Sequence, residues 1–108
     1  MAIKANITID QGADFSTEIS VTDDNGDPVN LTGYSAAAQL RKHYTSSTFT
    51  AFVANVNISG TVTLSMNAAT SSNVTAGRYV YDCELTSSGN VVSRLVEGIV
   101  TVTPQVTR

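Results

Sequence analysis

Apolar and polar residues alternate along most of the chain, which is the pattern of strands that bury one face. The first run spans Ile3–Asp10 and has its apolar residues at the odd positions. Phe15–Thr22 repeats the pattern, again with its larger apolar residues at odd positions. Five more strands are predicted at Tyr34–Leu40, Phe49–Ile58, Val62–Met66, Tyr79–Leu85 and Val91–Thr103. The alternation therefore predicts an all-β domain of about seven antiparallel strands.

Short polar segments rich in glycine separate these runs. They are Gln11–Asp14, Asp23–Pro28, Ser59–Gly60 and Ser88–Asn90. The second contains the strongest hairpin signal, an Asn-Gly pair, because these residues accept the positive φ angles of tight turns.

Residues 67–76 form the one segment that does not alternate. Asn67 can cap a single helical turn, with Ala68, Ala69 and Val74 facing inward. A helix this short is expected to serve only as a crossover between sheets.

The number and spacing of the strands predict an immunoglobulin-like β-sandwich with one short helical crossover, forming a single domain over residues 1–108. Tyr79 lies just inside a strand after the crossover, where such sandwiches often have a tyrosine corner. A plain core aromatic is the alternative for this residue. The apolar phase of the last strand shifts around Gly98, which predicts a β-bulge with the glycine as the extra residue.

Composition supports a folded domain and indicates which partners to expect. The chain is 42% hydrophobic with a net charge of −3, so it lacks the signature of disorder. Its six basic residues are scattered, and the short run Arg41–His43 is interpreted as a solvated strand end. We therefore expect no nucleic-acid partner. No targeting segment or membrane span is visible, so the protein is expected to be made in a cytoplasm and to remain soluble until it assembles.

Candidate catalytic residues are few, and none forms a recognisable constellation. Cys83 is the only cysteine and falls on an inward strand face, so we expect a buried, inert thiol. His43 has no local motif that links it to Cys83. Asp82 and Glu84 should point to solvent, and Glu97 stands alone in the sequence. We therefore predict no catalytic residue, no cofactor and no enzymatic activity.

Two further motifs have alternative interpretations. Asp23–Asp27 places oxygen ligands at alternating positions like a calcium loop, but the twelfth position is Tyr34 rather than Glu. A solvated hairpin turn is preferred, with weak calcium binding as the alternative, so no metal ligands are assigned. Four N-x-S/T sequons begin at Asn6, Asn30, Asn57 and Asn73, and are interpreted as incidental to a surface rich in Asn, Ser and Thr. Tyr44 is the one good surface aromatic for stacking on a sugar or a base.

Three stretches resemble small tail and baseplate modules of bacteriophages. Residues 7–15 read ITIDQGADF and residues 21–34 read VTDDNGDPVNLTGY, which match the patterns I-x-Q-G-x-x-F and V-x-D-x-x-G-x-P-V-x-L-T-G of those modules. The pair Arg41-Lys42 falls near the end of the third strand, as it often does in them. Residues 76–86, AGRYVYDCELT, followed by a glycine turn and a long last strand, complete the similarity.

The resemblance implies a non-enzymatic virion structural protein that acts through protein–protein contacts. Such modules usually head a longer protein, whereas this sequence stops at Arg108, which implies an accessory tail or baseplate subunit. A capsid decoration protein of the same fold is the alternative, and a carbohydrate- or calcium-binding adhesion module is a further one. Expected partners are other virion proteins or further copies of the chain, with no membrane. The first and last strands are predicted as edges that pair with a partner, through Ile3, Ile7, Ile9, Val92, Val96, Val100 and Val102.

Overall fold

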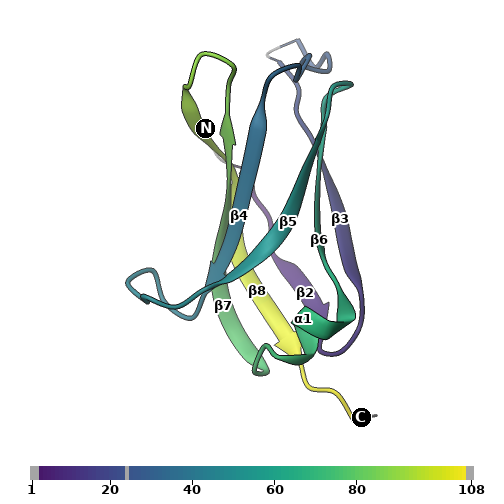
Figure 1. Cartoon of the computed structure of the whole chain (residues 1–108), viewed down its shortest axis with the longest axis vertical. Helices are drawn as coiled ribbons and strands as arrows, with labels where there is room; N and C mark the ends of the chain where they lie inside the picture. The colour runs from purple at the N-terminus through teal and green to yellow at the C-terminus, as the bar shows by residue number, and fades with distance from the viewer. Residues whose placement is uncertain (1–2, 24, 107–108) are drawn as a thin grey trace.

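Strands do account for most of the chain. The computed structural model describes residues 3–23 and 25–106. Eight strands and one short helix make up this described part (Figure 1). In chain order they are β1 Ile3–Lys4, β2 Ile7–Asp10, β3 Phe15–Ser20, β4 Ser35–Arg41, β5 Thr50–Asn57, β6 Thr61–Met66, α1 Ala68–Ser72, β7 Gly77–Thr86 and β8 Val92–Thr103. The all-β class and the short helical crossover are confirmed.

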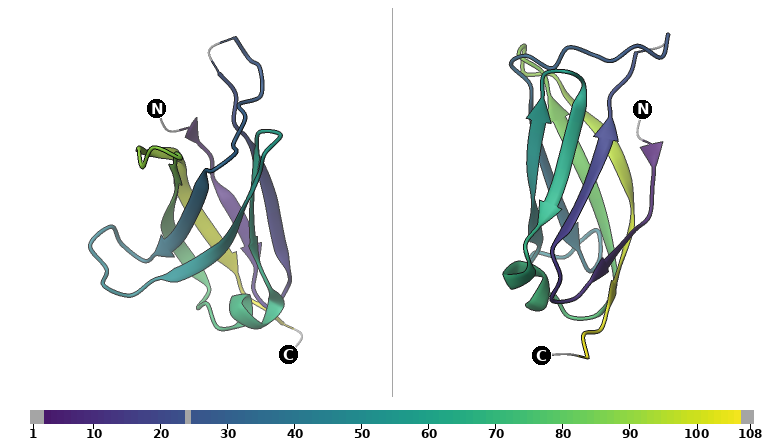
Figure 2. Two further views of the ribbon diagram at one scale, coloured as in Figure 1. Left: turned by 45° about the horizontal axis from the view of Figure 1, so that its top comes forward. Right: turned by 90° about the vertical axis from the view of Figure 1, so that its right-hand side faces the viewer.

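The strands form one continuous hydrogen-bonded path that curls until it is nearly barrel-shaped (Figures 1 and 2). Its order is β1-β8-β7-β4-β5-β6-β3, with β2 also paired to β8. Strand β5 makes the path continuous: Thr50–Phe52 pair with β4, whereas Val53–Asn57 pair with β6. The two layers are therefore joined at one side through β5. At the other side the path ends at β3 and at β1, and β2 pairs with β8 on the same side as β1.

The first predicted strand is divided into two, and its direction of pairing was predicted wrongly. β1 and β2 both run parallel to β8, with Ile7 opposite Val100 and Ile9 opposite Val102. The other strand pairs are antiparallel, as expected. Alternation reports which face of a strand is buried but not which neighbour the strand pairs with, so the pattern alone could not predict this pairing.

Gly98 explains why the first strand is interrupted. A Cβ atom at Gly98 would collide with the carbonyl group of Ala5, so only glycine allows the two backbones to approach this closely. The amide of Ala5 donates to the carbonyl of Glu97, and the amide of Ile99 donates to the side-chain oxygen of Asn6. An asparagine side chain thus replaces a backbone acceptor where β1 ends and β2 has not begun.

The β-bulge was predicted in the right strand but at the wrong residue. Gly98 pairs regularly with Tyr81, whereas the register shifts between Cys83, opposite Val96, and Glu84, opposite Arg94. Leu95 is therefore the extra residue. The shift in apolar phase seen in the sequence is produced by this bulge, and Gly98 has the separate steric role described above.

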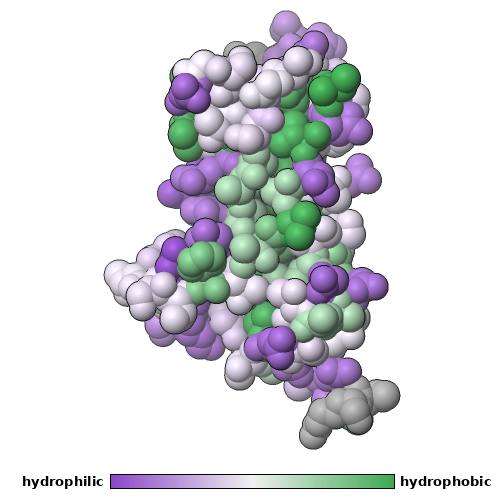
Figure 3. Space-filling model, viewed as in Figure 1, coloured by the Kyte–Doolittle hydropathy of each residue, from purple (hydrophilic) through white to green (hydrophobic). Residues whose placement is uncertain are grey.

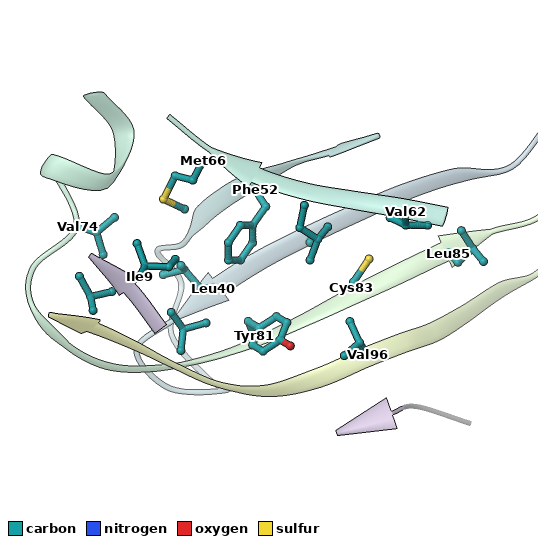
Figure 4. Packing of buried hydrophobic residues seen from close by; sticks show 14 of the residues in the cluster. Ile9, Leu40, Phe52, Val62, Met66, Val74, Tyr81, Cys83, Leu85 and Val96 are labelled. Atoms are coloured by element: carbon teal, nitrogen blue, oxygen red, sulfur yellow. The ribbon is translucent and has the colours of Figure 1, made fainter. Parts of the chain in front are cut away.

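The core lies between the two layers and is built from the residues that the alternation predicted (Figure 4). Val62, Leu64 and Met66 of β6 are buried, as are Tyr81, Cys83 and Leu85 of β7. Phe52 is the central aromatic, with its ring centroid 6.1 Å from that of Phe15 and 6.2 Å from that of Tyr81. Tilted and edge-on contacts of this kind are favourable for aromatic rings.

Helix α1 begins where the sequence predicted, but one of its inward residues differs. The side chain of Asn67 accepts a hydrogen bond from the amide of Thr70, which confirms the N-cap. Ala68 is half-buried and Val74 buried, whereas Ala69 is exposed, so its inward assignment was wrong. Ser71 is buried in its place. Its hydroxyl accepts from the amide of Gly12 and donates to the carbonyl of Ala13, which secures the turn before β3.

Gln11 belongs to the same turn and joins three distant segments. Its side-chain Nε2 donates to the carbonyl of Val74, and its side-chain Oε1 accepts from the backbone amide of Gln105. Gly12, the next residue, has a φ of 85°, a region that non-glycine residues avoid. The Gln-Gly pair of the first motif therefore has a structural role.

The predicted tyrosine corner is present. The hydroxyl of Tyr79, near the start of β7, donates to the carbonyl of Thr75 at 2.5 Å. The ammonium group of Lys42 lies 5.1 Å from the centroid of the Tyr79 ring. The corner thus fixes the entry into β7 and also contacts the loop that follows β4.

Candidate functional site

The two ends of the strand path are open edges. Among residues 3–23 and 25–106, β3 pairs only with β6, and β1 and β2 each pair only with β8. Each edge therefore offers backbone hydrogen-bonding groups to a further strand. On β2 the side chain of Ile9 is fully buried and that of Ile7 is half-buried, so these residues hold the edge against the core. Both β1 and β2 therefore lie at an edge, as the sequence predicted for the N-terminal strand, whereas pairing with a partner stays a prediction.

The last strand is not an edge along most of its length, so this part of the prediction was wrong. β8 has β7 on one side and β1 or β2 on the other, with Ile3 opposite Val96. Val96, Val100 and Val102 are 2%, 0% and 2% exposed and belong to the core. Val92 is exposed, and among the described residues its backbone pairs only with Thr86, because the pairing of β1 with β8 begins at Val96. The parallel N-terminal strands cover the edge that sequence reasoning left open. The edge at β3 was not singled out from the sequence.

Glu97, which stands alone in the sequence, has a carboxylate neighbour in the structure. It lies directly opposite Asp82 across the β7–β8 pair. Arg94 contacts both acids: its Nε is 3.5 Å from Oδ2 of Asp82, and its Nη1 is 3.5 Å from Oε1 of Glu97. The bulge at Leu95 accompanies this arrangement, because it shifts Arg94 relative to the rest of the ladder. Glu84 is exposed and Asp82 is half-buried on the outer face.

These charged groups line a shallow depression on the outer face of the sheet. Gln39, Asp82 and Glu97 are consecutive partners across β4, β7 and β8, so their side chains form one row. The depression has a volume of about 230 Å³. Its lining consists of Gln39, Arg41, Tyr44, Val80, Tyr81, Asp82, Arg94 and Glu97.

The loop between β4 and β5, which projects from the body of the molecule in Figure 1, forms one side of this depression. Arg41 fixes the loop: its Nη1 donates to the carbonyl of Ser46 at 2.5 Å and its Nη2 donates to Oε1 of Gln39 at 3.1 Å. The guanidinium also lies 4.9 Å from the centroid of the Phe49 ring. Tyr44, in the same loop, is 86% exposed. The basic run therefore organises a loop, which is more than the solvated strand end predicted.

The thiol of Cys83 is buried, as predicted. Its exposure is 0%, and burial, followed by the nearby carboxylates of Asp82 and Glu84, raises its pKa from 9.0 to about 11. A reactive cysteine has a lowered pKa and access to solvent, and Cys83 has neither. His43 is exposed on the loop after β4. The structure therefore does not make these two residues a nucleophile and its base.

The aspartate-rich turn has the features of a hairpin. Oδ1 of Asp23 accepts hydrogen bonds from the amides of Asn25 and Asp27, and Thr22 bridges to Pro28. Asp24 lies outside the described residues. Among the residues that are described, no three His, Cys, Asp or Glu side chains are grouped so that they could hold a metal ion.

The asparagines of the four sequons all make hydrogen bonds within the chain. The side-chain oxygens of Asn30 and Asn57 each accept from the amide and hydroxyl of the Thr or Ser two residues later. Asn6 accepts from Ile99, and Asn73 donates to the carbonyl of Ala69. In the sequons of Asn30 and Asn57 the Asn-x-Ser/Thr sequence is therefore a turn motif, because the asparagine side chain satisfies local polar groups.

Exposed apolar side chains are spread over the surface. On the face shown in Figure 3, strongly hydrophobic residues lie in separate groups between hydrophilic ones. Within the described residues, no helix is both long and apolar enough to cross a bilayer.

Comparisons with known proteins add little to this geometry. No protein family and no curated protein matches the sequence. A solved structure with a related arrangement is a family 123 glycoside hydrolase from Clostridium perfringens, which hydrolyses glycolipid glycans. The two are 13% identical with a TM-score of 0.45, over 95% of this chain and 23% of the hydrolase. The chain thus spans about a quarter of that protein's length, and a similarity this weak assigns neither fold family nor activity.

Proposed function

We propose that this chain is an immunoglobulin-like module that serves as a non-enzymatic structural subunit of a bacteriophage virion, in its tail or baseplate. The observation that carries the proposal is the pair of open edges at β2 and β3, which offer backbone groups for pairing with other subunits. The sequence resemblance to tail and baseplate modules supplies the biological setting.

Strand connectivity supports the immunoglobulin-like part of this proposal. In immunoglobulin constant domains the second, fifth and fourth strands pair in one sheet and the third, sixth and seventh in the other. If β1 and β2 together count as the first strand, β3-β6-β5 and β4-β7-β8 reproduce these two sets. The hydrogen bond from Tyr79 to Thr75 is a second feature of that class. Two features differ from that arrangement: β4 pairs with β5, which joins the two sheets, and β1 and β2 pair with β8 rather than with β3.

The residues behind the resemblance also have clear roles in folding. Gln11 and Gly12 lock the turn before β3, and Asp23 forms the hairpin turn. Gly33 has a φ of 81° at the entry to β4. A shared set of turn residues is what a shared fold requires, so these motifs support a common architecture.

Oligomeric state and virion association test the proposal. We expect light scattering after size exclusion to show a defined oligomer, or the purified protein to bind virions that lack the subunit. Lysine on a free edge opposes strand pairing. The double substitution Ser16→Lys and Ser20→Lys on β3 should therefore abolish assembly without unfolding the domain, because both residues are exposed.

Ser35→Lys is the matched control. Ser35 is also exposed, but it lies on β4, which pairs with β7 in the interior of the path. This variant should assemble normally. A protein that stays monomeric and never associates with virions would contradict the proposal. Electron microscopy of labelled virions separates the two locations: density on the tail supports the proposal, and density on the head indicates a capsid decoration protein.

A further inference from the structure

The depression between β4, β7, β8 and the loop after β4 brings charged groups of both signs together on the outer face of the sheet. Two carboxylates and two guanidinium groups, from Asp82, Glu97, Arg41 and Arg94, line a space of about 230 Å³. Their formal charges sum to zero. This volume is below the roughly 300–1,000 Å³ of pockets that enclose a drug-sized ligand, so the depression suits a small group rather than a peptide.

We propose that this depression is a binding subsite for an uncharged saccharide. In it Tyr44 stacks on a face of the sugar ring, while Gln39, Asp82 and Glu97 hydrogen-bond the hydroxyl groups. This inference goes beyond the proposed structural role and does not depend on it.

Charge balance determines the class of ligand. An anion would meet the carboxylates of Asp82 and Glu97, and a cation would meet the guanidinium of Arg94 between them. A neutral ligand with many hydroxyls avoids both costs, because each hydroxyl can donate to a carboxylate and accept from a guanidinium or amide. Hydrogen bonds to ionised groups are stronger than those between neutral groups.

The polar groups are held in place before any ligand binds. Gln39, Asp82 and Glu97 are consecutive partners on three paired strands, which is a rigid platform. Arg41 engages the side-chain oxygen of Gln39, which directs the amide nitrogen of Gln39 to other acceptors. Arg94 bridges the two acids. Little side-chain entropy is therefore lost when a ligand binds.

Tyr44 supplies the apolar contact. It is 86% exposed although it lines the depression, so folding leaves most of its ring available. The face of a tyrosine ring is weakly negative and suits the C–H groups on one face of a pyranose. Arg41 holds the loop that carries Tyr44 through the carbonyl of Ser46, which positions the ring beside the polar row.

NMR titration of the whole chain tests the site. The probes are glucose, galactose, mannose, rhamnose and N-acetylglucosamine, added in the presence of EDTA, with a glycan array to extend the range to oligosaccharides. We expect saturable shifts of the backbone amides around Gln39, Asp82 and Glu97, with weak affinity because the site is shallow. Tyr44→Ala should weaken binding about fivefold to tenfold, whereas Tyr44→Phe, which keeps the ring, should bind nearly as the parent does.

Asp82→Ala should weaken binding about tenfold, through the loss of a charged acceptor. Glu18→Ala is its control, because Glu18 is exposed on β3, remote from the strands that form the depression. The proposal would be overturned if no sugar caused saturable shifts and no glycan on the array bound. It would also be overturned if neither Tyr44→Ala nor Asp82→Ala weakened binding. Shifts confined to a different depression, such as the one between Phe49 and α1, would also overturn it. A preference for sialic acid or glucosamine would contradict an uncharged ligand.

Discussion

The hydroxyl of Tyr81 donates a hydrogen bond of 2.6 Å to the carbonyl oxygen of Ala5, 76 residues earlier in the chain. Tyr81 pairs with Gly98 in β8, and Ala5 lies against that glycine. A buried ring on β7, a residue without a side chain on β8 and a break between β1 and β2 thus form one structural unit. This unit attaches the N-terminal strands to the sheet.

Gly98→Ala should destabilise the protein by about 1–3 kcal/mol, because the added methyl group meets the Ala5 backbone rather than a flexible side chain. Gly89→Ala is the matched control: the nearest atom to its Cβ would be Oγ of Ser87 at 3.8 Å, an ordinary contact. Its free energy of unfolding should change by less than about 0.5 kcal/mol. Urea titration measures both. An equal loss of unfolding free energy in Gly98→Ala and Gly89→Ala would contradict the steric role of Gly98.

Tyr81→Phe should cost about 1 kcal/mol of unfolding free energy and should loosen the N-terminal strands in particular. The amide of Ala5 donates to Glu97, so its hydrogen-exchange rate reports on this attachment. We expect faster exchange at Ala5 in Tyr81→Phe. Tyr79→Phe, which removes the bond to Thr75, should cost a similar amount but leave exchange at Ala5 unchanged. Unaltered exchange in both variants would show that the Tyr81 hydroxyl does not hold β1.

Stability should fall as the pH rises above about 9. Burial raises the pKa of Cys83 from 9.0 to about 11, and burial, followed by Cys83, raises the pKa of Tyr81 from 10.0 to about 12. Between these values the unfolded chain loses protons that the folded chain keeps, so ionisation favours unfolding. This loss of stability is absent at pH values below the pKa that each group has in the unfolded chain. Each proton contributes a slope of at most about 1.4 kcal/mol per pH unit.

Urea unfolding at several pH values from 7 to 11 tests this linkage. In Cys83→Ala the loss of stability between pH 9 and 10 should be smaller than in the parent chain, although the variant is less stable at pH 7 because a cavity is left. The slope above pH 10 should remain, because Tyr81 is still present. An identical pH profile in both proteins would contradict the role assigned to the thiol.

Arg94→Ala should reduce stability by less than about 1 kcal/mol, and the loss should shrink in 1 M salt. The substitution leaves Asp82 and Glu97 facing each other without a cation, and like charges directly opposite are unfavourable. The pairs are half-exposed, which limits their contribution. Arg78→Ala is the control, since Arg78 is exposed on β7 and has no ion pair among the described residues. If the stability loss of Arg94→Ala were the same at low salt and in 1 M salt, Arg94 would act through packing rather than through its charge.

Local pattern was sufficient to predict several elements. The inward residues of β6 and β7 follow from the two-residue period of a strand, which depends on backbone geometry alone. The N-cap at Asn67 and the corner at Tyr79 each join residues no more than four positions apart. Such features are readable because the sequence itself brings their partners together.

Features that depend on pairing between distant strands were missed. Glu97 was expected to stand alone, although the β7–β8 register places Asp82 opposite it. The bulge was placed at Gly98 rather than Leu95, because a phase shift in the sequence locates a bulge only to within several residues. The saccharide subsite proposed here combines three strands and a loop, so no local motif predicted it.

By itself the sequence determined that this protein is all-β, which faces of its strands are buried and where its turns lie, because these properties depend on nearest neighbours along the chain. Tertiary structure decided which strands are neighbours, that the N-terminal strands run parallel to β8, and which edges stay open. The physical reason is that side-chain alternation records burial but carries no information about the partner, whose identity is set by packing of the whole sheet.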